Sequence, residues 1–273
     1  MTLALMEAVV DEARPGVLVR AIGCEGHSVT IERAVAGGEW LPVRSGFPAR
    51  VVGGEAAAYD WEAEPGTRAS YRAVGEQTTA ASMVATVDVP PLPACTGAAC
   101  STWLKHVERP GLSVKARILH PDNPSRAGRG SFVEPDGAGV LPHYRSQGLS
   151  GRQGSYTVRV SGWDALDALD RLLAEPGTVL LHANPAHGLR AMYLAVTGAG
   201  ESRPGNTPGW EWRDVEFSWR QVGRPWPGGA PLLVPGWSWR EAIRDAATLQ
   251  QVAGRYPTRW DLLLAGTRAA RTA

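Results

Sequence analysis

The chain has 273 residues, of which 44% are hydrophobic and 20% charged, a balance typical of a globular protein and not of a disordered or fibrous one. At roughly 150 residues per domain, this length predicts about two domains. Because 28 basic residues face 27 acidic ones, the net charge of +1 argues against a surface built to bind nucleic acid or an anionic membrane.

The first 14 residues predict an N-terminal arm and not an export signal. No basic residue precedes the apolar stretch, and Glu7, Asp11 and Glu12 interrupt it. No part of the chain reaches the roughly 18 uncharged apolar residues that a membrane-spanning helix needs. We therefore expect a product made in the cytoplasm, with no insertion into a membrane.

Residues 15–87 predict a small β-sandwich. Six short runs of strand-forming residues are separated by turns that contain glycine or proline. Tyr71 stands early in one of these runs, five residues after the Pro65-Gly66 turn. From this position its hydroxyl could form a corner-type hydrogen bond to the preceding loop.

A linker is predicted over residues 88–102, because three prolines stiffen it and a small, polar segment follows. The second domain, residues 103–235, is expected to be a β-sandwich or split barrel with one flanking helix. Alternating apolar and polar residues mark its strands. The helix is predicted over 163–174, where leucines recur at helical spacing and Ser161 stands three residues before Asp164, as in a capping box.

Aromatic residues are densest between positions 210 and 219. Trp210 and Trp212 share one parity, whereas Val215, Phe217 and Trp219 share the other. Either a bulge restores a single buried face near this change of phase, or both faces of the strand are covered.

Short helices are predicted over residues 236–273. Two helix starts are indicated, one by Ser238 with Glu241 and one by Thr258 with Asp261. The whole chain is thus predicted to be mainly β, with a short helical C-terminus.

A search for catalytic chemistry finds no nucleophile elbow, no phosphate-binding loop and no His-Glu-x-x-His motif. The three cysteines, Cys24, Cys95 and Cys100, form no disulfide framework, and Cys95 and Cys100 can either pair within one loop or stay free. With His106 near by they also supply fewer than the four ligands that zinc usually takes. We expect no catalytic, cofactor-binding or metal-binding residues, and no enzyme activity.

Two further groups have a functional and a structural interpretation, and we favour the structural one for both. His182 and His187 flank a turn between two strands, and no third metal ligand is indicated. The predicted helix also carries an aspartate at every third position, Asp164, Asp167 and Asp170. We interpret them as the solvent-exposed face opposite the leucines, and not as paired carboxylates for acid and base catalysis.

The 11 tryptophans leave two functional classes open. Exposed aromatic rings can stack on sugars, which would suit a carbohydrate-binding protein. Aromatic residues that alternate with polar ones are also typical of a core strand or a subunit interface, and we favour that interpretation because exposed tryptophan is costly.

Several motifs, in this order along the chain, resemble the minor tail proteins of actinobacterial phages and prophages. They lie at residues 29–33, 42–44, 59–66 and 70–73, at 103–106 with 109–114, at 151–159, at Trp219 with Arg224-Pro225, and at 258–263. The first group resembles a fibronectin type III or immunoglobulin-like module. The order of strand, Gly-Arg-x-Gly, strand, helix and strand is similar to the N-terminal domain of distal tail proteins.

The resemblance implies a structural virion component at a siphophage tail tip, where the chain would form or join a hexameric ring between tail tube and baseplate. Its partners would be copies of itself, other tail and baseplate proteins and, through the sandwich module, the host cell surface. It implies assembly in the bacterial cytoplasm and no catalytic residues. The sandwich comes first in this chain, unlike the usual plan, which leaves its position along the tail open. A carbohydrate-binding adhesion protein is the alternative.

Overall fold

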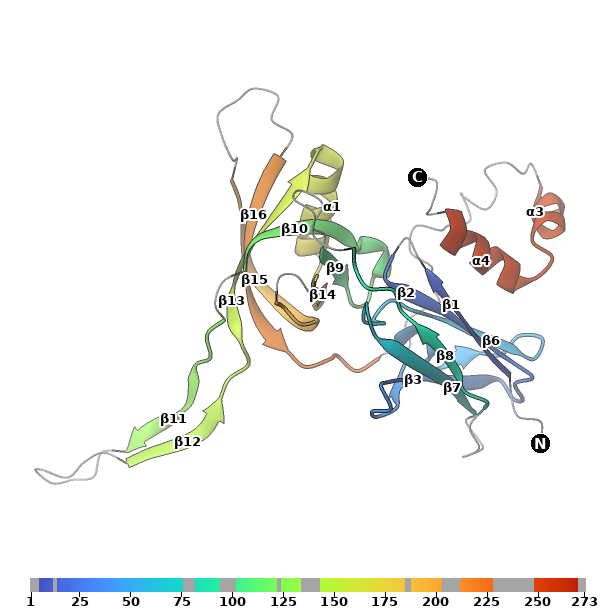
Figure 1. The fold of residues 1–273 in the computed structure, drawn as a ribbon, viewed down its shortest axis with the longest axis horizontal. Coiled ribbons are helices and arrows are strands. Elements are labelled where there is room, and N and C mark those ends of the chain that lie inside the picture. Colours follow the sequence, from blue (N-terminus) through green and yellow to red (C-terminus); the bar gives the residue numbers. More distant parts are fainter. Residues whose placement is uncertain are drawn as a thin grey trace, which may run out of the picture. The chain divides into compact units, whose positions relative to one another are not determined.

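The structure is a computed structural model that describes residues 5–11, 14–75, 82–93, 102–121, 124–133, 143–184, 188–202, 212–227 and 248–269. It is mainly β with antiparallel sheets, which confirms the predicted fold class (Figure 1). The chain divides into two compact units. The first contains Met1–Ala94, Lys105–Ser113 and Pro225–Ala273, and the second contains Cys95–Leu104 and Val114–Arg224.

The first unit holds two sheets. One has the order β1 (Leu5–Asp11), β2 (Gly16–Ile22), β6 (Glu55–Asp60). The other has the order β4 (Leu41–Pro42), β3 (Ser28–Val35), β7 (Arg68–Gly75), β8 (Ala85–Asp88), with β5 (Ala49–Arg50) also paired to β3 and a 3-10 turn, η1, at Arg44–Gly46. Because the chain changes sheet between β2 and β3, β5 and β6, and β6 and β7, it winds as a Greek-key sandwich.

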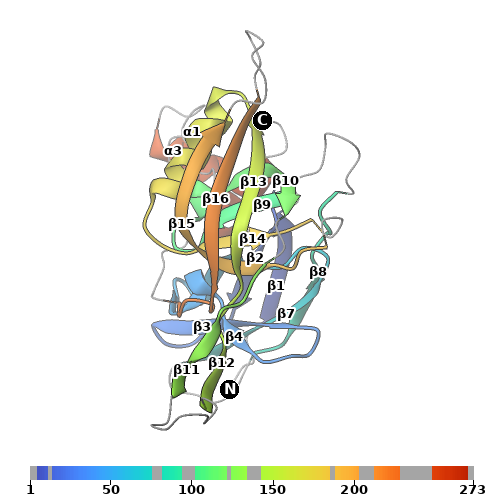
Figure 2. The same ribbon diagram turned by 90° about the vertical axis from the view of Figure 1, so that its left-hand side faces the viewer.

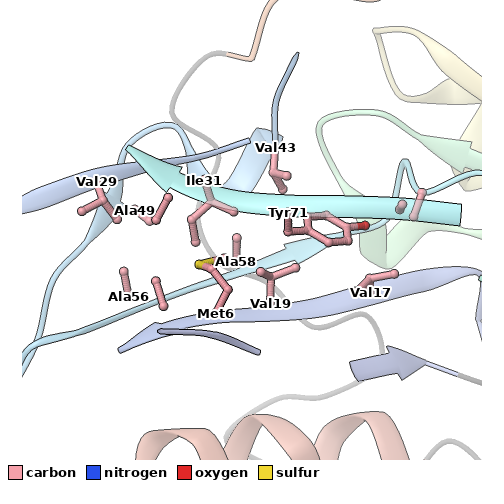
Figure 3. Packing of buried hydrophobic residues seen from close by; sticks show 14 of the residues in the cluster. Met6, Val17, Val19, Val29, Ile31, Val43, Ala49, Ala56, Ala58 and Tyr71 are labelled. Carbon is pink, nitrogen blue, oxygen red and sulfur yellow. The ribbon is translucent and has the colours of Figure 1, made fainter. Parts of the chain in front are cut away.

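The core of this sandwich forms between the inner faces of the two sheets. Alternation along β2 directs Val17, Val19 and Ala21 inward, and all three are fully buried. They meet Ile31 of β3 and Tyr71 of β7 (Figure 3). Burying an isoleucine-sized side chain contributes roughly 1.5–3 kcal/mol, so the alternating pattern is sufficient to hold the sheets face to face.

The outer face of the β1-β2-β6 sheet is also covered. Leu18 points away from the sandwich core and packs with Tyr59 and Trp61 in a second cluster. Helix α4 (Arg259–Ala269) adds Trp260 to it, with Leu263 and Leu264 packed against its margin. This explains why three consecutive residues of β2, Val17 to Val19, are all buried.

Both helices of the described C-terminal segment begin at a side-chain cap. At α4, Thr258 Oγ1 accepts from the Asp261 backbone N–H at 3.1 Å, and the Asp261 carboxylate accepts from the Thr258 N–H at 3.1 Å, as predicted. Helix α3 (Leu249–Arg255) begins after Thr248, whose hydroxyl accepts from the Gln251 N–H. The predicted start at Ser238 lies outside the described residues.

The second unit is a closed barrel whose strands follow the order β10-β13-β16-β15-β14-β9. These are β9 (Thr102–His106), β10 (Val114–Pro121), β13 (Gln153–Ser161), β14 (Val179–His182), β15 (Met192–Ser202) and β16 (Trp212–Val222). A 3-10 turn, η3 (Pro110–Leu112), follows β9 in the chain. Inside the barrel Tyr156 stacks on Trp219 at a centroid distance of 4.8 Å and meets Phe217 edge-on at 6.0 Å. The barrel is therefore filled by side chains around these rings.

Helix α1 (Trp163–Ala174) buries Leu166, Leu169 and Leu172, as its periodicity predicts. The predicted cap at Ser161 is wrong: the N-cap is Gly162, and no side chain caps the helix. Gly162 has φ 81°, a left-handed conformation that suits glycine, and it moves the helix start one residue beyond Ser161.

Strand β16 resolves the predicted change of phase. Its ladder with β13 runs without a register shift from Trp212 to Arg220, so no bulge restores a single face there. Instead, the consecutive residues Asp214 and Val215 are both buried. Because neighbouring residues on a strand point to opposite faces, both faces of β16 are covered at this point. Trp210 lies outside the described residues. The register shift occurs on the other side, between Val196 and Gly198 of β15.

The unit boundaries differ from the predicted domain limits. The predicted arm contains β1, which pairs with β2 from Leu5↔Ile22 to Asp11↔Gly16. Within the predicted linker, Val89 and Leu92 are buried, so residues 88–93 pack within the first unit, whereas Thr102 begins β9 in the second unit. Residues 105–113 and the described C-terminal helices also belong to the first unit.

Candidate assembly surfaces and a buried ionic network

Asp60, at the end of β6, is the centre of a buried ionic network. Arg33 Nη1 donates to both of its carboxylate oxygens, at 2.9 and 2.7 Å, and the Tyr71 hydroxyl donates to Oδ2 at 3.0 Å. The predicted corner tyrosine thus donates to a side chain at the end of the preceding strand, and not to the loop that follows that strand. Burial, reinforced by the Asp60 charge, raises the pKa of Tyr71 well above its usual value, so the hydroxyl remains a donor.

Lys105 lies beside this network and is almost completely buried. Its Nζ atom donates to the carbonyl oxygens of Trp61, at 2.9 Å, and Pro15. Burial lowers the pKa of Lys105 to about 7, although the charges of Asp60, Asp11 and Glu62 oppose this shift. Trp61 in turn donates from Nε1 to the Val107 carbonyl at 2.9 Å. These bonds hold residues 105–107 in the first unit.

Arg44 forms a second buried ion pair, with its Nη2 atom 3.1 Å from Glu62 Oε1. The same guanidinium donates to the carbonyl oxygens of Pro225, at 2.8 Å, and Trp226, at 3.2 Å. The ring of Trp226 remains 73% exposed and meets Phe47 edge-on at 5.8 Å. The ion pair therefore anchors a backbone segment that presents an aromatic ring to solvent.

The candidate residues that the structure describes lie in separate places. His106 is buried, and its Nδ1 accepts from the backbone N–H groups of Glu108 and Arg109, so it shapes a turn. His182 is buried on β14. Cys24 is a half-buried free thiol, whereas Cys95, Cys100 and His187 lie outside the described residues. The side chains of the described segments contain no cluster of three potential metal ligands.

Asp164, Asp167 and Asp170 occupy the exposed face of α1, opposite its buried leucines, which confirms the amphipathic interpretation. The tryptophans divide between core and surface. Trp61, Trp219 and Trp260 are buried, whereas Trp163 and Trp226 are exposed. Trp163 carries the guanidinium of Arg213 on its ring, at 4.7 Å from the centroid.

An exposed sheet edge distinguishes the second unit. Strand β14 pairs with β15 only from Leu181↔Met192 to Val179↔Leu194, whereas β15 stays paired with β16 as far as Ser202↔Asp214. All six residues from Thr197 to Ser202 are exposed. Among the described residues, no strand pairs with this part of β15 on its outer side. We call Thr197–Ser202 the β15 edge.

A two-stranded hairpin of the same unit pairs with no other strand of the described chain. It consists of β11 (Gly128–Val133) and β12 (His143–Leu149). It extends away from the barrel, beyond the start of β13 (Figure 2). Arg126 and Arg129 are exposed at its base and on β11. Neither the edge nor the hairpin is indicated by a recognisable sequence motif, because glycine-rich segments have low strand propensity.

No protein-family model matches the chain, and a search of the curated proteins finds no match. In the described part of the chain, every helix is too short or too polar to span a membrane.

Proposed function

We propose that this chain is a structural component of a phage tail tip, which assembles with copies of itself into a ring between tail tube and baseplate. The observation that carries the proposal is the β15 edge, a run of six exposed residues whose outer backbone groups have no partner among the described strands. Such an edge is a template for pairing with another chain. The protein would be located in the virion, after assembly in the host cytoplasm.

Three further features support a structural role. Aromatic side chains lie in the interior of the barrel, and the Arg33–Asp60 and Arg44–Glu62 pairs of the first unit are buried. The motifs that resemble minor tail proteins lie in or next to strands and helices. The resemblance implies six subunits, and heterologous contacts that close on themselves give such rings. Other tail and baseplate proteins would be its neighbours.

The direct test is electron microscopy of the purified full-length protein together with its mass by light scattering. Closed rings with a mass that is a multiple of the monomer, sixfold for the hexamer, are the expected result. A protein that remains monomeric at its highest soluble concentration would count against self-assembly.

A second function, recognition of carbohydrate on the host surface, is favoured by Trp226. Its ring is 73% exposed, while Arg44 holds its backbone in place, and a fixed exposed ring can stack on a sugar. The test is binding of the full chain to oligosaccharides of the bacterial envelope. Trp226→Ala should abolish that binding and Trp163→Ala should leave it intact. Equal binding by Trp226→Ala and the unaltered chain would remove Trp226 as the site.

A further inference from the structure

The buried amine of Lys105 joins three segments of the first unit that are distant in sequence. It donates to the carbonyl oxygens of Pro15, between β1 and β2, and of Trp61, just after β6. We propose that Lys105 is a proton-operated latch: its uncharged amine holds residues 105–113 to the sandwich, and protonation of the amine releases them. The latch acts within a single chain, independently of the proposed ring.

The two acceptors match the uncharged form of the amine. A neutral lysine amine has two N–H groups, and here both find a carbonyl oxygen, whereas the ammonium has a third N–H. Lys105 is 1% exposed, and within the described part of the chain its amine forms no ion pair. A buried ammonium of this kind loses its hydration and gains no counter-charge in direct contact, which is unfavourable. Protonation therefore weakens the closed arrangement.

The carboxylates that face Lys105 do not offset this cost. The charged groups around its amine come from the end of β1, the loop that follows, and the end of β6, and they are Asp11, Arg14, Asp60 and Glu62. Each carboxylate already accepts from another side chain at 3.1 Å or less, and these donors are Tyr59 for Asp11, Arg33 for Asp60 and Arg44 for Glu62. Burial outweighs the more distant attraction to Lys105 and lowers the pKa of its amine to about 7.

The segment that the latch holds is short and partly exposed. Residues 105–113 belong to the first unit, whereas the chain on both sides of them belongs to the second. His106 shapes a turn within the segment, and Trp61 donates from Nε1 to the Val107 carbonyl beside the latch. Glu108 is exposed. Such a segment can open at a lower free energy than the core strands, so its release does not require the sandwich to unfold.

Proton linkage gives the direction of the switch. In the closed arrangement the pKa of Lys105 is about 7, and an amine released into water returns to its ordinary value of 10.5. Between these values the open form binds a proton that the closed form lacks, so each pH unit of acidification should raise the open fraction about tenfold. Below pH 7 both forms carry the proton, and the open fraction should no longer change.

Acylation of the unaltered full-length chain by acetic anhydride, followed by mass spectrometry, tests the latch. The chain has only two lysines, and because Lys115 is exposed, each molecule contains its own control. The Lys115 rate should rise about tenfold per pH unit from about 7 to about 10, because the reactive neutral fraction does. The Lys105 rate should stay level, because rarer opening cancels the growing neutral fraction of the opened amine. The ratio of the two rates should fall roughly a thousandfold over this range.

The dependence on urea separates local release from global unfolding. In about 1 M urea the Lys105 rate should stay within about twofold, because local release exposes little surface, whereas global unfolding would raise it at least about fivefold. A Lys105 rate that rises in parallel with that of Lys115 overturns the latch. So does a Lys105 that reacts only when urea unfolds the chain.

Hydrogen exchange shows which backbone the latch holds. After correction for intrinsic rates, the protection of residues 105–113 should rise about tenfold per pH unit from about 7 to about 10, while that of β13 in the barrel should stay constant. Lys105→Met should abolish this rise, and Lys115→Met, the matched control, should keep it. Protection of residues 105–113 that is constant with pH in the unaltered chain would overturn the latch as well.

Discussion

Lys105 donates a hydrogen bond from its Nζ atom to the carbonyl oxygen of Trp61, at 2.9 Å, inside the first unit. Lys105 belongs to the first unit, where the charges of Asp60, Asp11 and Glu62 act on its amine. A buried amine of this kind makes folding depend on pH, because its protonated form is poorly solvated.

The first prediction concerns that pH dependence. The folded pKa of Lys105, about 7, lies below the ordinary value of 10.5. Between these values the unfolded chain binds a proton that the folded chain has lost, so the free energy of unfolding should rise with pH from about 7 to about 10. Below pH 7 both states are protonated and this stabilisation is absent. Denaturant titrations across this range should show a rise on the order of a few kcal/mol.

Lys105→Met should flatten that rise, because methionine fills a similar space without an amine. Lys115→Met is the matched control, since Lys115 is exposed, and it should keep the pH profile of the unaltered chain. If the Lys105 variant and the control gave the same profile, burial of the amine would not be the cause of the pH dependence.

A second prediction concerns the Arg44–Glu62 pair, whose two side chains are at most 2% exposed. Arg44→Met leaves Glu62 as a buried charge without this partner and should lower the free energy of unfolding by about 3–5 kcal/mol. Arg44→Met combined with Glu62→Leu removes both charges and should cost less than the single change. Urea denaturation of the two singles and the double measures this. Additive losses would mean that the two side chains do not stabilise one another.

Much of the sandwich could be predicted from sequence, because each strand carries its own alternation of apolar and polar residues. The closure of the barrel could not be predicted from sequence. It depends on the pairing of β9 with both β10 and β14, and the sequence of one strand does not show which strands lie beside it. Strand β15 shows the limit clearly. Thr197-Gly198-Ala199-Gly200 has low strand propensity, yet pairing with β16 keeps the strand extended to Ser202.

The ionic network was missed for a related reason. Arg33, Asp60 and Lys105 are ordinary charged residues in the sequence, and a charged residue on a strand is usually taken as solvent-facing. Only the fold brings Arg33 of β3 to within 2.7 Å of Asp60 of β6. Tyr71 carried the one usable signal, its place after the Pro65-Gly66 turn, although its acceptor proved to be a carboxylate.

A third prediction ranks changes around Asp60. Asp60→Asn removes the negative charge that holds Arg33 and should lower the free energy of unfolding by about 3–5 kcal/mol. Tyr71→Phe removes one of several donors and should cost about 1–2 kcal/mol. Chemical denaturation of both variants gives the ranking. An Asn variant that is as stable as the Phe variant would contradict a buried charge pair at this site.

The last prediction tests the cover on the outer face of the β1-β2-β6 sheet. Trp260 is 8% exposed, packs with Leu18, Tyr59 and Trp61, and lies under the guanidinium of Arg20, which is 5.3 Å from its ring centroid. Trp260→Ala should therefore lower the free energy of unfolding by about 3 kcal/mol. Trp163→Ala is the control of equal size, and because that ring is 63% exposed it should cost no more than about 1 kcal/mol. Hydrogen exchange should show faster exchange in β2 for the Trp260 variant alone, since loss of the α4 contact exposes Leu18 to water. Similar losses of stability in both variants would mean that α4 adds nothing to the sandwich beyond what an exposed tryptophan adds elsewhere.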